Sequence, residues 1–422
     1  MDNSPPERKA PLKGSWEDLL NQADHLAANF NDAAIPLYQR VVDGLYKLPP
    51  TARRAADGKL HKLFMRGVLG YQGYLNTRDR FVESLDVLAK LESVVESDDD
   101  KKMARLLTAQ VNILADRFED GIAIYRSFAD RSGATLADWQ PLLWTYIRAG
   151  RAAEALHLIP VLMQIAAAEE ETRAESGAGN PEDSGSPLAF ARAIAAVVQL
   201  EAGETAAALA SYDELLALGK EYAGNAFTAY SRLAQQGRYE DALRYIEVDR
   251  ARMVRASFWR GLVLDLMGQP KRAREAYAVA ATPQSLEQDS RSISEHILAQ
   301  YALGDPEAKA LESLLSLLRE RPATDNWIIF YLIGIGWIVR GDLTAARANL
   351  RLAVTQIKWH ADGHAIPALY WFMAQRIIPA DHHAEFQTYF ERPHRPDATA
   401  TSAAEPAAPS DPAPPDSDTE AA

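Results

Sequence analysis

Hydrophobic and polar positions alternate along this chain in a pattern that predicts pairs of amphipathic helices. A turn residue is followed within about five positions by a small residue, and four positions later by a large apolar one, as in QGRYEDALRYI at 236–246. We call the small residues anchors; they are Ala34, Ser84, Gly121, Ala155, Ala208, Ala242, Ala273, about Lys309, Ala346 and Ala384. Because most anchors lie about 34 residues apart, the chain is predicted to be a repeat array.

Each repeat is expected to be one helix, a short turn and a second, antiparallel helix. Glycines such as Gly150 and Gly237 stand where the first helix must stop, because glycine adopts the left-handed cap conformation without steric cost. The anchor allows the second helix to approach the first closely, and a large residue four positions later shares its face. These large residues are Tyr38, Leu88, Tyr125, Ile159, Tyr212, Ile246, Tyr277 and Leu350.

This pattern resembles the tetratricopeptide repeat (TPR) over roughly residues 15–391. The position twelve before the anchor, usually Gly or Ala in that family, is Ala109, Ala196, Gly261 and Gly334 in four repeats. The usual Tyr nine before the anchor occurs once, as Tyr146. The resemblance implies an all-α fold, an α-α superhelix (solenoid) of about nine to ten antiparallel helix pairs that binds proteins on its concave face.

Three segments differ in composition from the repeats. Residues 1–14 are polar and are predicted to be disordered. Residues 168–187 are rich in Gly, Ser, Glu and Pro, and we expect a flexible insertion within one helix pair. Residues 392–422 form an acidic tail rich in Pro and Ala that cannot bury a core, so this tail is also predicted to be disordered.

Composition and charge argue against several classes of protein. The 58 acidic residues outnumber the 45 basic ones, giving a net charge of −13, which disfavours nucleic acid as a partner. The absence of cysteine excludes disulfides, iron–sulfur clusters and thiol catalysis. The apolar run Trp327–Val339 is too short to cross a membrane and is expected to be a buried helix. The polar start Met1–Lys13 has no secretion signal, so a cytoplasmic and, by general character, bacterial protein is expected.

The first helix of each pair is expected to line the concave face, with residues about 18, 15, 11, 7 and 6 positions before the anchor pointing into it. The candidate partner-binding residues are Gln110, Gln140, Trp144, Arg148, Arg255, Phe258 and Tyr331. Aromatic side chains mixed with Gln and Arg suit a peptide or helix as ligand. The competing interpretation is that the large side chains in this set pack between repeats.

Signals for catalysis and for metal binding are weak. His360 and His364 are four residues apart, a spacing that can place two metal ligands on one helix face, but Gly363 interrupts the stretch and no HExxH motif is present. Phosphate-binding and nucleophile motifs are also missing. We therefore predict no enzyme, no cofactor and no metal site.

The leading hypothesis is a non-enzymatic adaptor or scaffold that binds a peptide or helix of a partner protein in its concave groove. One alternative is a structural subunit of a larger assembly that uses the outer faces of the array. A second alternative is a metal-dependent enzyme or regulator that uses the His-rich C-terminal end.

Overall fold

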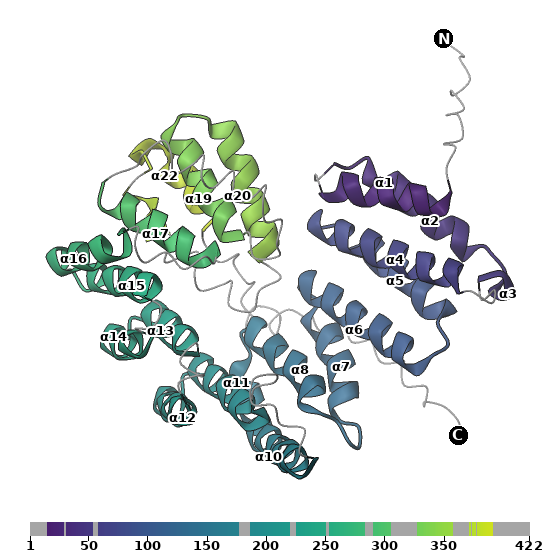
Figure 1. The fold of residues 1–422 in the computed structure, drawn as a ribbon, viewed down its shortest axis with the longest axis horizontal. Coiled ribbons are helices and arrows are strands. Elements are labelled where there is room, and N and C mark those ends of the chain that lie inside the picture. Colours follow the sequence, from purple (N-terminus) through teal and green to yellow (C-terminus); the bar gives the residue numbers. More distant parts are fainter. Residues whose placement is uncertain are drawn as a thin grey trace, which may run out of the picture.

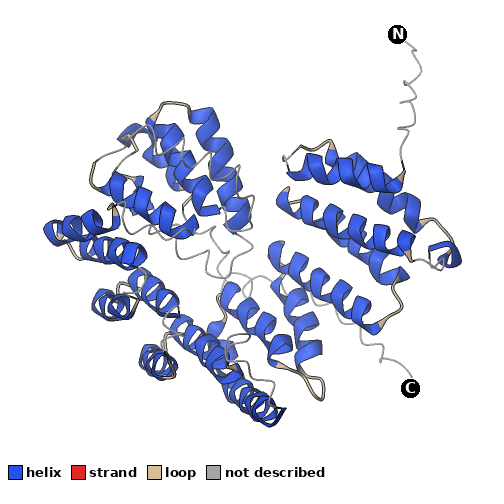
Figure 2. Ribbon diagram, in the orientation of Figure 1, coloured by secondary structure: helices blue, strands red, loops and turns tan. Residues whose placement is uncertain are grey.

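The chain is an α-α superhelix. The computed structural model describes residues 15–28, 31–53, 58–176, 186–219, 225–249, 253–282, 290–304, 327–357, 371–372, 374–376 and 378–390, in which the regular elements are all helical (Figure 2). Consecutive helix pairs follow a curved path from α1, past α10 and α11, to α19 and α20 (Figure 1). Along the stretch from α11 to α16, the second helices α12, α14 and α16 lie on the outer side of this curve (Figure 1).

The helices alternate between the first and the second member of each pair. The first helices are α1 (Trp16–Ala28), α4 (Lys59–Thr77), α6 (Asp98–Leu114), α8 (Leu136–Arg148), α11 (Pro187–Glu201), α13 (Ala226–Gln235), α15 (Met253–Leu266), α17 (Ser290–Ala302) and α19 (Trp327–Val339). The second helices are α2 (Ala34–Tyr46), α5 (Phe81–Val94), α7 (Phe118–Ala129), α9 with η1 and α10 (Ala152–Ala155, Leu156–Leu158 and Ile159–Ser176), α12 (Thr205–Ala217), α14 (Tyr239–Val248), α16 (Pro270–Ala280) and α20 (Leu343–Ile357). Three short elements complete the described part: α3 (Pro50–Arg53), η5 (Ala380–His382) and α22 (His383–Gln387).

The turns between paired helices share one backbone motif. In the turn after α8, the Arg151 amide donates to the Tyr146 carbonyl across five residues at 2.9 Å, and Gly150 between them has a φ of 71°. This is the Schellman arrangement, which satisfies carbonyls left open at a helix C-terminus. Asp79 and Asp116 take the left-handed position in two other turns, with φ of 55° and 59°. Aspartate tolerates this conformation better than most residues, so these turns form without glycine.

The predicted anchors lie at the contact between paired helices. Ala34, Ser84, Gly121, Ala155, Ala208, Ala242, Ala273 and Ala346 are buried, as predicted. In α15, an added Cβ at Gly261 would lie 2.6 Å from the ring of Tyr277, the large residue of the same pair. Ala384 is exposed, so the last anchor was wrong, and Lys309 lies outside the described residues.

The prediction of a flexible insertion at 168–187 is wrong for its first part. Residues 168–176 continue α10 as a regular helix, and Pro187 opens α11. Ala, Glu and Arg, which are frequent in 168–176, are good helix formers. Residues 177–185 lie outside the described part of the chain, as do the predicted disordered segments 1–14 and 392–422.

Two apolar stretches bear on membrane insertion. The described side chains of α19 are almost all buried, which confirms the buried-helix prediction for Trp327–Val339. Among the described residues, Ala152–Glu175 is the one helical stretch long and apolar enough to cross a membrane by length and composition. A core helix of a solenoid passes the same test, and α10 packs against α8 and α11 as the second helix of its pair.

Candidate functional site

Four consecutive first helices in the N-terminal half present an open concave face. His61 of α4 lies 3.9 Å from Asp100 of α6, and Lys102 of α6 donates to Asp138 of α8 at 2.6 Å. These contacts hold the first helices side by side, so side chains at the same repeat position form rows across them. We define the open row as the exposed or half-buried residues 18, 15 and 11 positions before the anchor: Arg66, Leu69 and Gly73 on α4; Met103, Leu106 and Gln110 on α6; Ala137, Gln140 and Trp144 on α8; and Phe190 and Ala193 on α11.

The open row is largely apolar. Leu69 and Phe190 keep 36% and 38% of their surface exposed. Leu106 and Trp144 are half-buried and pack against the core with one side. Apolar and aromatic side chains that share a row and stay accessible to solvent are characteristic of protein-binding surfaces.

The four predicted residues of this half lie in or beside the open row. Gln110, Gln140 and Trp144 belong to it, and Arg148 follows Trp144 by one turn of α8. In the described part of the chain, Arg148 makes no salt bridge, and its Nε atom is buried without a hydrogen-bond acceptor. Burial lowers the pKa of Arg148, and the charge of Asp116 opposes that effect. The guanidinium still carries its charge, because an arginine pKa starts so far above neutrality.

In the C-terminal half the described positions of the same row are buried, and we call this the closed half. This burial corrects the prediction for three binding residues. Arg255, Phe258 and Tyr331 are 6%, 0% and 1% exposed, so a ligand cannot reach them in this structure. The Arg255 Nε donates to the buried Asp249 carboxylate at 3.2 Å. The competing interpretation, packing within the array, holds for these three residues.

The described residues among 371–390 pack against the C-terminal half. The Tyr331 hydroxyl donates to the Tyr389 carbonyl at 2.9 Å, and its ring lies 4.8 Å from that of Phe390. Arg376 donates to Asp265 of α15 at 2.5 Å, although the two residues are 111 positions apart. This contact joins the C-terminal residues to α15, across the helix pairs that lie between them in the chain.

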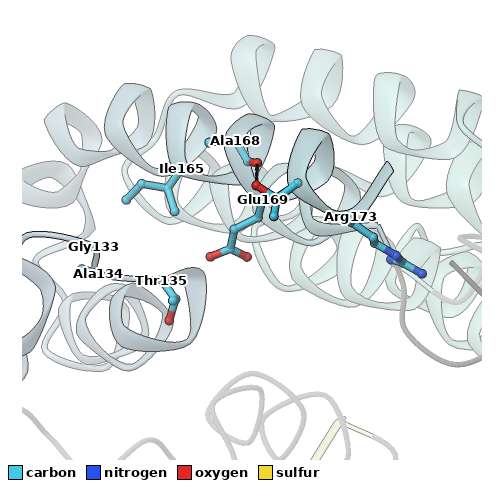
Figure 3. A pocket seen from close by; sticks show the side chains of 8 residues that line it. Gly133, Ala134, Thr135, Ile165, Ala168, Glu169 and Arg173 are labelled. Carbon is cyan, nitrogen blue, oxygen red and sulfur yellow. Dashed lines mark hydrogen bonds between the residues drawn. The ribbon is translucent and has the colours of Figure 1, made fainter. Parts of the chain in front are cut away.

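A hollow beside α10 was missed by the sequence analysis. Residues 133–135 and the α10 residues Ile165, Ala168, Glu169, Thr172 and Arg173 line a space of about 570 Å³ (Figure 3). The Glu169 side chain points toward Thr135 across this space (Figure 3). The Leu136 amide, at the start of α8, donates to Glu169 Oε1 at 2.9 Å.

The neighbouring Glu170 performs the same role for α11. Its Oε2 atom accepts hydrogen bonds from the Ser186 hydroxyl at 2.6 Å and from the Leu188 amide at 3.3 Å. A carboxylate at a helix N-terminus satisfies open amide donors and interacts favourably with the helix dipole. Adjacent glutamates of α10 therefore cap the two first helices on either side of it.

Loss of the Glu169 cap is expected to loosen the start of α8. We expect Glu169→Ala to cost about 1 kcal/mol, the usual value of an N-cap. Glu171→Ala, at an exposed position of the same helix, is the matched control and should change stability by less than about 0.5 kcal/mol. Hydrogen exchange in the first turn of α8 measures the difference, and equal exchange in the two variants would contradict the capping role.

The histidine cluster proposed as a metal site is only partly described. The described residues contain no group of three metal-ligating side chains. The His383 ring lies with Nε2 2.8 Å from the Ile378 carbonyl, and the His382 ring lies 3.9 Å from Asp381. His360 and His364 lie outside the described residues.

Comparison with known proteins identifies no family. No protein-family model and no curated protein matches the chain. The apo form of the quorum sensor NprR from B. thuringiensis is 15% identical, over 81% of this chain and 97% of that one, with a TM-score of 0.35. NprR in complex with its cognate peptide NprX is 13% identical, over 81% and 98% of the two chains, with a TM-score of 0.31.

Proposed function

We propose that this chain is a non-enzymatic, TPR-like adaptor that binds a peptide or helix of a partner protein along the open row. The main support is that four consecutive first helices keep apolar side chains accessible at equivalent positions. Leu69 on α4 and Phe190 on α11 lie at the two ends of this row. In the C-terminal half the equivalent positions that the structure describes are buried, so exposure here is not a general property of the repeat. We also predict that the protein is cytoplasmic.

The binding surface can be mapped by site-specific photo-cross-linking in the native cell. A photoreactive residue replaces Gln140 in the open row or, as the matched control, the exposed Val279 on α16, a second helix. We expect discrete protein adducts from position 140 and none from position 279. Adducts from position 279 alone would instead favour the alternative in which the chain assembles through its outer faces.

Trp144 is expected to be the main contact for the cross-linked partner. Buried tryptophans dominate many interfaces, and their truncation commonly costs 2 kcal/mol or more. We therefore expect Trp144→Ala to weaken binding by at least about tenfold, and Trp144→Phe to weaken it less. Calorimetric titration measures both, with circular dichroism as a check that each variant is folded. Unchanged affinity in a folded Trp144→Ala variant would contradict binding along the open row.

A further inference from the structure

Among the described residues 18, 15, 11, 7 and 6 positions before the anchor on α4, α6, α8 and α11, Arg148 is the one charged residue without a salt bridge. Arg66 of the open row donates from Nε to Asp24 at 3.1 Å. Glu201 of α11 holds the same repeat position as Arg148, seven before the anchor, and its carboxylate accepts from Arg232. The acidic residue at the equivalent position of the next repeat is therefore already engaged with another arginine.

The surroundings of Arg148 leave its charge poorly compensated. Its Nε is enclosed and has no acceptor. The acidic residue that acts on it, Asp116 in the turn before α7, is exposed and not within salt-bridge distance. A guanidinium that has lost water contacts without gaining a carboxylate is destabilised, and this cost is recovered when an acid binds.

We propose that the partner segment bound along the open row carries an Asp or Glu side chain that pairs with Arg148, next to a large apolar side chain that packs on Trp144. This inference rests on the proposed function and adds the chemistry of the ligand. Arg148 and Trp144 are four residues apart on α8, so both face the same stretch of ligand. The two glutamines of the row, Gln110 and Gln140, can bond to the backbone of the ligand beside these side chains.

The acid belongs to a side chain and not to a chain terminus. The open row continues to both sides of α8, through Leu106 and Leu69 in one direction and Phe190 in the other. A ligand that uses the whole row must run past Arg148 in both directions. Its C-terminal carboxylate would reach Arg148 only if half of the row stayed empty.

The test selects ligands from a phage-displayed library of random peptides whose C-termini are fused to the coat protein, so that terminal carboxylates are absent. The full chain is used as wild type, Arg148→Gln and Arg148→Glu, with Arg244→Gln on the second helix α14 as the matched control. We expect peptides with an acid at a fixed distance from a large apolar residue to be enriched by wild type and by the control. Arg148→Gln should lose the preference for the acid, and Arg148→Glu should replace it with Lys or Arg.

A synthetic peptide from the wild-type selection then gives the energy of the contact. Replacing its acid with the matching amide should weaken binding to wild type by about tenfold and to Arg148→Gln by less than about twofold. An acid preference that survives in Arg148→Gln, or enriched apolar peptides with no acid, would overturn this inference and leave the proposed function standing. The absence of any enriched peptide with folded protein would overturn both.

Discussion

Replacing Gly261 with alanine is expected to destabilise the pair formed by α15 and α16 by about 2 kcal/mol, the middle of the range for overpacked cores. The added Cβ would lie 2.6 Å from Cδ1 and Cε1 of Tyr277. That ring is almost completely buried and packs against Phe258, so it has little room to move. The gain in helix propensity, up to about 1 kcal/mol for Gly to Ala, offsets only part of this clash.

Gly73 provides the matched control. It also lies inside a first helix, α4, but an added Cβ there has no atom within 4 Å. Gly73→Ala should therefore stabilise the protein by about 0.5–1 kcal/mol, the opposite sign. Because repeat arrays unfold in parts, hydrogen exchange of α15 and α4 amides is the suitable measurement. Equal effects of the two substitutions would show that the contact with Tyr277 does not limit this position.

The features that could be predicted from sequence are those that depend on neighbouring residues. One example is the turn at Gly150, which is followed by the buried anchor Ala155 and then by a packing face. These three features lie within about ten residues of one another. Each pair contacts mainly the next one, so correct local assignments were sufficient for the superhelix. The anchor at Ala384 failed because the second helix there shortens to α22, five residues long, and leaves that residue exposed.

The length of α10 could not be read from composition alone. Glutamates at 169–171 suggested a solvated linker, as charged runs often do. In the structure Glu169 and Glu170 cap α8 and α11, whose N-termini lie 33 and 18 residues away along the chain. These glutamates therefore make tertiary contacts, which cannot be predicted from local periodicity.

The division of the concave face into an open and a closed half depends on curvature. Phe258 and Trp144 lie 15 and 11 positions before their anchors, and both were predicted to be binding residues. Whether such a side chain is accessible depends on how tightly successive helix pairs curve. In the C-terminal half, Arg376 contacts Asp265, which lies 111 positions earlier in the chain. The curvature is the sum of many small packing angles, and no single repeat encodes it.

Removal of Glu201 is expected to be among the most damaging single changes at the surface between helix pairs. Its carboxylate accepts from Arg232 of α13, whose side chain is 5% exposed. A buried arginine that loses a carboxylate keeps the cost of leaving water with less compensating attraction, and breaking a buried pair commonly destabilises a protein by roughly 3 kcal/mol or more. Glu201 itself is half-buried, so we expect Glu201→Ala to cost about 3 kcal/mol, the lower end of that range.

An exposed ion pair between the next two helix pairs gives the matched control. Arg260 of α15 donates to Glu247 of α14 at 2.7 Å, and the two side chains are 44% and 36% exposed. Such pairs contribute between about 0 and 1 kcal/mol, so Glu247→Ala should leave the free energy of unfolding nearly unchanged. The double variant Glu201→Leu/Arg232→Leu should recover most of the loss, because it removes the charge along with its partner. Hydrogen exchange of α11, α13 and α14 amides in the four proteins distinguishes the cases, and similar losses in Glu201→Ala and Glu247→Ala would show that burial of Arg232 does not set the cost.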